Sequence, residues 1–140
     1  MSLPTQLELQ VVSADRMLVN EPVDEVEVPG ADGYFGVLPG HTPLLAALQV
    51  GQLSYRRGQE TQYLSIAFGF AEVQPDRVTI LAQVAERAED IDLARAEAAR
   101  RRAEERLAKS APDIDFERAR ISLLKSLIRL QVASRVRIRS

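Results

Sequence analysis

The segment GYFGVLPGHTPLL, residues 33–45, decides the fold class of the first part of the chain. Five of its thirteen residues are glycine or proline, and the only histidine of the protein, His41, lies among them. Glycine permits positive φ and proline removes a backbone donor, so neither a long helix nor a central strand fits this segment. We expect a structured loop or sheet edge that is anchored by apolar side chains.

Apolar and polar residues alternate on both sides of this segment, which is typical of half-buried strands. The alternation is clear at residues 7–12 and 26–28, and residues 52–70 and 70–82 each read as a pair of strands around a turn. Turn signals recur at Asp15-Arg16, Pro29-Gly30, Arg57-Gly58 and Pro75-Asp76. This spacing predicts an antiparallel β-sandwich or flattened barrel over residues 1–84.

The second part of the chain, residues 85–140, has helical character, since it contains no glycine and only one proline. The pattern Asp-Ile-Asp-x-x-Arg-Ala occurs twice, at residues 90–96 and 113–119, and each copy precedes a run with helical periodicity. An aspartate before a helix accepts hydrogen bonds from free backbone N–H groups and lies at the positive end of the helix dipole. We therefore expect N-caps at Asp92 and Asp115.

The two helices are expected at about residues 91–109 and 114–134, with Pro112 in a polar turn between them. This arrangement predicts an antiparallel helical hairpin. The first helix offers mainly alanine to the contact, and the second offers Ala119, Leu123, Leu127 and Leu130. Because alanine buries little area, we expect the contact to gain only a few kcal/mol, roughly what chain ordering costs. Such a hairpin can open.

Composition and charge exclude several classes of function. The chain has no cysteine and one histidine, which excludes a disulfide framework and leaves a zinc site dependent on carboxylates. No segment approaches the ~20 apolar residues of a membrane span, and no signal peptide is visible, so direct membrane insertion is not expected. A pI near 5.5 and the lack of aromatic residues around the C-terminal arginines argue against nucleic-acid binding. No nucleophile and base can be paired, so the chain is not expected to be an enzyme by itself.

The two parts also differ in charge: residues 1–84 carry a net −6 and residues 85–140 a net +4. Opposite net charges indicate different binding partners. His41, between Pro-Gly and Thr-Pro, is interpreted as a turn residue rather than a general base. Three nearby acids are interpreted as a solvated strand edge rather than a metal site. They are Asp24, Glu25 and Glu27.

Four features follow one another along the chain: LELQVVSADR (7–16), GVLPGHTPLL (36–45), the Asp-Ile-Asp-x-x-Arg-Ala helix start, and a hairpin rich in alanine and arginine. Together they resemble the epsilon subunits of F-type rotary ATP synthases. The resemblance implies a non-catalytic rotor subunit of the central stalk that couples c-ring rotation to ATP synthesis. It implies contacts with the gamma subunit, the c-ring and the catalytic alpha and beta subunits, and a peripheral location at the cytoplasmic face of the inner (plasma) membrane.

The resemblance also implies roles for particular residues. Asp32, Tyr34 and His41 are expected near the contact with the c-ring and gamma subunit. The hairpin is expected to be mobile and to inhibit ATP hydrolysis, with basic residues of its second helix facing acidic loops of the catalytic subunits. Those basic residues are Arg118, Arg120, Lys125, Arg129 and Arg135.

Some members of this family bind ATP, which makes ATP a candidate regulatory ligand although no cofactor is required. The matching positions here are Glu86, Asp92, Arg95, Arg102, Lys125 and Arg129. Lys125 stands where the ATP-binding relatives have arginine, and lysine offers a point charge instead of a bidentate fork. The same Asp-x-x-Arg spacing recurs at Asp115 and Arg118, where capping and local pairing explain it, so both interpretations stay open.

An alternative function belongs to another class. The chain can be interpreted as a free-standing β-sandwich binding module whose helical tail self-associates or senses a nucleotide. The two hypotheses differ in what purifies with the chain: the gamma subunit and catalytic hexamer in the first case, and further copies of the chain in the second.

Overall fold

The computed structural model describes residues 3–109 and 115–138. The chain divides into two compact units, Met1–Arg87 and Ala88–Ser140. The first unit contains seven strands and the second contains the helices. The predicted fold class, a β-sandwich followed by a helical hairpin, is confirmed.

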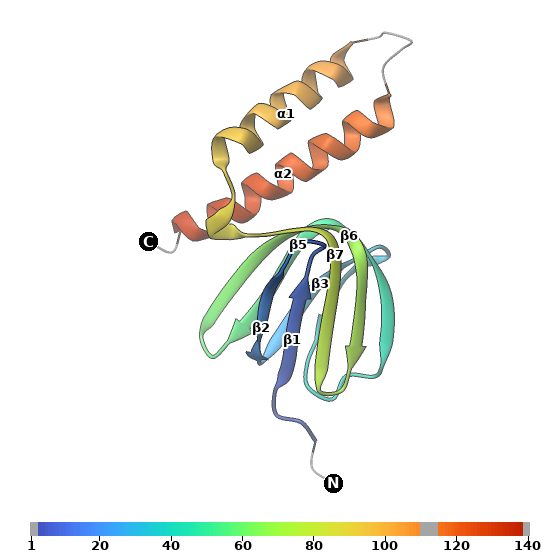
Figure 1. Ribbon diagram of the computed structural model, residues 1–140, viewed down its shortest axis with the longest axis vertical. Helices are drawn as coiled ribbons and strands as arrows, with labels where there is room; N and C mark the ends of the chain where they lie inside the picture. Colours follow the sequence, from blue (N-terminus) through green and yellow to red (C-terminus); the bar gives the residue numbers. More distant parts are fainter. Residues whose placement is uncertain (1–2, 110–114, 139–140) are drawn as a thin grey trace. The chain divides into compact units, whose positions relative to one another are not determined.

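The strands of the first unit form one sheet in the order β2-β1-β7-β6-β5-β3-β4 (Figure 1). Their bounds are β1 Leu7–Val12, β2 Met17–Val23, β3 Glu25–Gly30, β4 Gly33–Val37, β5 Leu44–Arg57, β6 Glu60–Gln74 and β7 Arg77–Arg87. All neighbours are antiparallel except β1 and β7, which are parallel. The glycine- and proline-rich segment supplies the edge strand β4, the following loop and the start of β5, in agreement with the predicted sheet edge.

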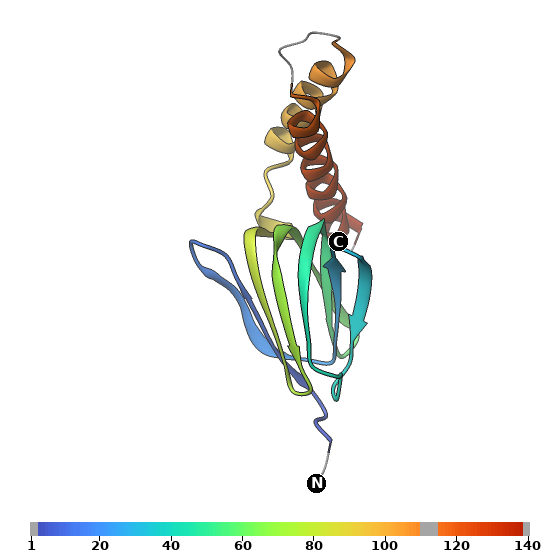
Figure 2. The same ribbon diagram turned by 90° about the vertical axis from the view of Figure 1, so that its right-hand side faces the viewer.

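The core lies on one face of each strand, as the alternation in the sequence predicts. In β1, for example, Leu7, Leu9 and Val11 are fully buried. Tyr55 is the largest buried side chain of the unit. In Figure 1, β3 lies behind β1, and Figure 2 shows the same strands from the side. The apolar faces meet between them in a single core cluster.

The longest strand, β6, folds back on itself. The turns before and after it both lie near the start of β1. The Asp24 carboxylate accepts hydrogen bonds from the Gly58 N–H of the first turn and from the Gln6 amide, and the Glu8 N–H of β1 donates to the Asp76 carbonyl of the second turn. A straight strand of fifteen residues would hold its ends about 50 Å apart. The strand must therefore reverse, and Figure 1 shows both turns at the end of the sheet near the N-terminus.

The reversal occurs at Phe68 and Gly69, which have φ angles of 62° and 126°. A side chain on Gly69 would place its Cβ 2.0 Å from the Leu81 carbonyl oxygen, so only glycine fits there. The sequence interpretation divided this region at Phe70, with one pair of strands ending there and another beginning. That division is wrong, because β6 runs unbroken from Glu60 to Gln74.

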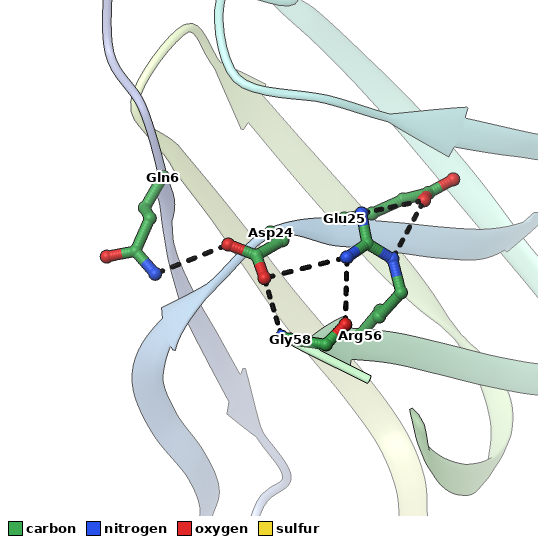
Figure 3. Close-up of polar contacts among 5 residues, drawn as sticks. All are labelled: Gln6, Asp24, Glu25, Arg56 and Gly58. Carbon is green, nitrogen blue, oxygen red and sulfur yellow. Dashed lines mark hydrogen bonds and ion pairs between the residues drawn. The ribbon is translucent and has the colours of Figure 1, made fainter. Parts of the chain in front are cut away.

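A polar cluster ties three segments together at the end of the sheet where these turns lie (Figure 3). The Asp24 carboxylate accepts hydrogen bonds from the Gly58 N–H at 2.7 Å and from the Gln6 amide at 3.3 Å. Arg56 bridges Asp24 and Glu25 at 3.6 and 3.4 Å. The Gly58 N–H, followed by the Gln6 amide, holds the pKa of Asp24 below its usual 3.8. Asp24 is therefore a structural acceptor and not the merely solvated acid of the sequence interpretation.

The second unit begins with a short 3-10 helix, η1 (Ala88–Asp90), followed by α1 (Leu93–Ala108) and α2 (Phe116–Ile138). Both predicted N-caps are confirmed: the Asp92 carboxylate accepts the Arg95 N–H at 3.1 Å, and Asp115 accepts the Arg118 N–H at 3.0 Å. The predicted turn around Pro112 lies outside the described residues. Within the described part of the chain, no helix is long and apolar enough to cross a membrane.

The helix contact is thin on the α1 side, where the buried residues are Ala96 and Ala103. On α2, Ala119 is buried as expected, but Leu127 is 44% exposed and Ser126 is buried in its place. The Ser126 hydroxyl donates to the Leu123 carbonyl at 2.8 Å, which satisfies it inside the helix. The predicted leucine face is therefore wrong at Leu127, although the expectation of an alanine-lined contact holds.

Candidate docking surface

A row of apolar side chains crosses the outer face of five neighbouring strands. Strand register places these residues side by side: Ala47 opposite Phe70, Phe70 opposite Leu81, Leu81 opposite Val12, and Val12 opposite Met17. Directly opposed residues on one face hold their Cβ atoms about 5 Å apart, so the five side chains form a continuous strip. We call this strip the outer row.

Apart from the half-buried Val12, the members of the outer row are exposed to solvent because they alternate with core residues. Phe70 is 55% exposed while Ala71 is fully buried, and Leu81 is 54% exposed while Ile80 is fully buried. Leu45, two residues before Ala47 on β5 and so on the same face, is 69% exposed. Singly exposed apolar residues are ordinary, but a contiguous exposed strip indicates a surface that another molecule covers.

The outer row ends beside a cavity of about 430 Å³ at one end of β5. Its walls are the turn between β3 and β4 (residues 30–35) and the first residues of β5 (44–47). Two of the predicted docking residues, Asp32 and Tyr34, line this cavity together. Asp32 is exposed, so the cavity combines apolar walls with a carboxylate at its rim.

Tyr34 is fixed from the side of its hydroxyl group. The phenolic oxygen accepts the backbone N–H of Gln52 at 2.8 Å, and it lies where a side chain on Gly51 would be, 2.5 Å from that Cβ position. Tyr34 as a whole remains 48% exposed. Tyr34 therefore fastens the β3–β4 turn to β5, and part of the residue stays accessible to a partner.

His41 does not line this cavity. Its Nδ1 donates to the Thr42 carbonyl at 2.6 Å and its backbone N–H donates to the Leu38 carbonyl at 3.1 Å. The neighbouring Gly40 N–H donates to the Pro75 carbonyl at 2.7 Å. His41 is thus a turn residue in a loop that is fastened to the β6–β7 turn, which agrees with its interpretation from the sequence.

The residues proposed for nucleotide binding divide between the two units, because Glu86 lies on β7 and the others lie at or in the helices. The Asp92 carboxylate serves as the α1 cap. Arg95 and Arg102, seven residues apart on one face of α1, are exposed, and neither side chain forms an ion pair with the described residues. Lys125 and Arg129 are half-buried and take part in other contacts.

The basic residues of α2 are not all equally available. Arg118 is exposed, whereas Arg120 is paired with Glu117 at 2.6 Å. The hydrogen bond from Arg120 lowers the pKa of Glu117 and keeps this pair charged. Arg129 and Arg135 are half-buried. In the described residues no three histidine, aspartate or glutamate side chains gather as a metal site would require.

Sequence reasoning missed the outer row. Its members come from five strands, and only the register of the sheet brings them together. The available signal was weak: Phe70 and Leu81 interrupt the alternation of the segments in which they occur, but an interruption alone does not say which residue faces outward.

Comparison with known proteins finds one match for each unit. Residues 6–88 match the family described as "ATP synthase, Delta/Epsilon chain, beta-sandwich domain", and residues 89–134 match the corresponding "long alpha-helix domain". The chain is 50% identical over 106 residues to the ATP synthase epsilon chain of Koribacter versatilis, covering 76% of this chain and 75% of the relative. It is 47% identical over 131 residues to ATP synthase epsilon chain 2 of Syntrophotalea carbinolica, covering 93% and 95%.

Solved structures share the fold. A chain of the Euglena gracilis mitochondrial ATP synthase structure with OSCP, F1 and c-ring superposes with a TM-score of 0.80 at 23% identity, over 99% of this chain and 84% of that chain. A chain of the Tetrahymena thermophila central stalk and c-ring structure superposes with a TM-score of 0.57 at 11% identity, over 96% and 98%. Since both units match and the sequence identities are high over most of the chain, this protein belongs to the ATP synthase delta/epsilon chain family, as an epsilon-type, non-catalytic subunit of that complex.

Proposed function

We propose that the β-sandwich holds this subunit on the rotor of the ATP synthase by binding the gamma subunit and the polar loops of the c-ring. The outer row carries the proposal. A non-catalytic subunit acts through its surfaces, and the outer row is a strip of apolar side chains over five strands of the sandwich, exposed at all its members except the half-buried Val12. The rigid core behind these strands suits a part that must transmit torque without deforming.

The outer row and the cavity offer different chemistry to the proposed rotor partners, the first apolar and the second partly polar. Phe70 and Leu81 offer apolar area, which matches a folded partner such as the gamma subunit. The cavity offers the exposed Asp32 beside apolar walls, which matches a polar loop with a basic or amide side chain. The c-ring loops are therefore assigned to the cavity and the gamma subunit to the outer row.

Replacing Phe70 and Leu81 together by serine tests this assignment. We expect co-purification with the gamma subunit to fall by about tenfold or more, since two exposed anchors are removed. Leu3→Ser is the matched control, because Leu3 is 80% exposed but lies outside the strands. Equal recovery of gamma with the double variant and with the control would reject the outer row as the docking site.

The helical hairpin acts as a brake on ATP hydrolysis in this proposal. Its contact is lined by alanine on the α1 side, so its compact state is held weakly. Its part of the chain carries a net +4 that complements acidic loops of the catalytic alpha and beta subunits. The subunit then works as a peripheral part of the complex, at the cytoplasmic face of the inner (plasma) membrane.

ATP is a second candidate partner, as a regulatory ligand of the helical unit. The observation in its favour is that Arg95 and Arg102 are exposed on one face of α1 without an ion pair to any described residue, whereas Arg120 on α2 is paired. Two unpaired guanidinium groups can bind phosphate oxygens. Calorimetric titration measures the Kd for ATP. We expect this Kd to rise about tenfold or more in a double variant that carries both Arg95→Ala and Arg102→Ala. The control variant Arg120→Ala should bind ATP with an unchanged Kd. No heat at millimolar ATP would exclude the ligand.

A further inference from the structure

The outward position of Phe70 depends on a change of alternation inside β6. Before residue 67 the core side chains of this strand are Leu64 and Ile66, and after residue 70 they are Ala71 and Val73. Side chains of a strand alternate with a period of two, so an uninterrupted strand that buries Ile66 would also bury Phe70 and expose Ala71. The pattern has shifted by one residue between them.

The shift coincides with the reversal of β6. Phe68 and Gly69 are consecutive residues with positive φ, and Phe68 is the only non-glycine residue with positive φ in the described part of the chain. Glycine adopts such angles freely, but a bulky residue there is an outlier that the surrounding structure must impose. Position 69 also requires glycine, because β7 leaves no room for a Cβ beside the Leu81 carbonyl.

Register across the sheet is kept through this point. Residues on both sides of the reversal pair in one continuous register with β5 (Val50 with Ala67, Leu48 with Gly69) and with β7. No residue is inserted as in an ordinary bulge. β5 and β7 change their core side at the same level of the sheet, from Leu48 to Leu53 and from Ala82 to Ala85. Within these three paired strands, only Phe68 and Gly69 have positive φ.

We propose that Phe68 and Gly69 are a positioning pair whose left-handed backbone turns Phe70 out of the core and into the outer row. Phe68 acts through its backbone conformation, and its aromatic ring is not the group that the partner binds. This inference rests on the proposed docking role of the outer row, and it names what makes that row available.

Site-specific labelling tests the geometry directly. The chain contains no cysteine, so a single introduced thiol reports one position. Phe70→Cys and Ala71→Cys are made in the natural background and in Phe68→Gly, Phe68→Asn and Phe68→Val. Glycine and asparagine favour the left-handed region, and β-branched valine disfavours it. When residue 68 is phenylalanine, glycine or asparagine, a maleimide should react at least about tenfold faster with a cysteine at position 70 than with one at position 71. When residue 68 is valine, this ratio of rates should fall or invert.

Binding to the gamma subunit should separate the Phe68 variants into the same two groups. Phe68→Gly and Phe68→Asn should co-purify with the gamma subunit as well as the natural chain does, although both lose the aromatic ring. Phe68→Val should lose gamma although it keeps an apolar side chain. A general loss of stability would speed labelling at the buried position 71 without slowing it at position 70, whereas a change of side should also slow labelling at 70. The absolute rate at position 70 therefore separates positioning from general structural damage.

Three outcomes would overturn the proposal. The first is a natural labelling ratio in a folded Phe68→Val, and the second is a lost ratio in Phe68→Gly. The third is loss of gamma binding in Phe68→Gly or Phe68→Asn with the ratio intact, which would assign the ring itself to the interface. If Phe68→Val does not fold by circular dichroism, the glycine and asparagine variants still decide through the last two outcomes. Failure of the outer row as a docking site shows instead as full gamma binding in Phe70→Ser, whatever the labelling ratios are.

Discussion

At the scale of single residues, Asp24 shows how one side chain closes an end of the sandwich. It lies between β2 and β3 and binds the turn between β5 and β6 through the Gly58 N–H, and it also binds Gln6 ahead of β1. Its partners are thus 34 and 18 residues away along the chain. No periodicity or motif signals such a contact, which explains why the sequence grouped Asp24 with Glu25 and Glu27 as solvated acids.

We expect Asp24→Asn to lower the Tm of the subunit by about 2–5 °C at neutral pH, because the charged acceptor of two hydrogen bonds is lost. The pKa of Asp24 is lowered in the folded chain, first by the Gly58 N–H and then by Gln6. A lowered pKa contributes stability above the ordinary value of 3.8, and that contribution is lost as the pH falls through the folded pKa. The difference in Tm between the natural chain and the variant should therefore shrink as the pH is lowered from about 6 to 3.

Thermal unfolding followed by circular dichroism measures this difference. Asp15→Asn serves as control, since Asp15 is an exposed acid in the turn between β1 and β2. A Tm difference that stays constant over the acid range would mean that ionisation of the Asp24 carboxyl group does not contribute to stability.

At the scale of elements, the sequence predicted correctly those strands, turns and helix caps that depend only on residues close together in the chain. Alternation located the strand positions 7–12 and 26–28, and the Arg57-Gly58 turn separates β5 from β6 as expected. Both aspartate caps were predicted because capping involves only the first turn of a helix. The glycine- and proline-rich segment was placed at a sheet edge because those residues cannot serve a central strand.

The failures at this scale have a common cause, which is that a neighbouring element decides the outcome. β6 continues through Phe70 because β5 and β7 hold it in register on both sides of the reversal. Leu127 is exposed and Ser126 buried because the serine hydroxyl bonds to its own helix and so tolerates burial. The candidate site divides in the same way: Asp32 and Tyr34, which the family resemblance implied together with His41, lie on one local turn, whereas the outer row needs the whole sheet.

At the scale of the whole molecule, the chain joins two units that differ in structure and charge. The strands carry a net −6 over residues 1–84 and the helical part a net +4, and each unit has its own internal contacts. A unit that folds by its own contacts can be removed without destroying the other. The proposed functions therefore divide as well, with docking in the sandwich and the brake in the helices.

Deleting residues 113–140 removes α2 and tests this division. The deletion takes away all seven basic residues from Arg118 onward and leaves the outer row and the cavity intact. We expect the assembled enzyme to hydrolyse ATP several-fold faster under conditions where the natural enzyme is latent, because a two-state element needs its second helix to reach the inhibitory state. Assembly, measured as gamma and c-ring subunits recovered with the truncated chain, should be unchanged.

A chain shortened only by Arg139 and Ser140 is the control for the deletion, and it should remain latent. Hydrolysis that stays low after the longer deletion would argue against a brake in the helices. Faster hydrolysis together with lost gamma recovery would have a different meaning: the helical part would then help to hold the subunit on the rotor, and the division between the two units would be wrong. Fast hydrolysis with full recovery is the one result that places the brake in α2 and the docking in the sandwich, because docking through the outer row requires nothing beyond Arg87.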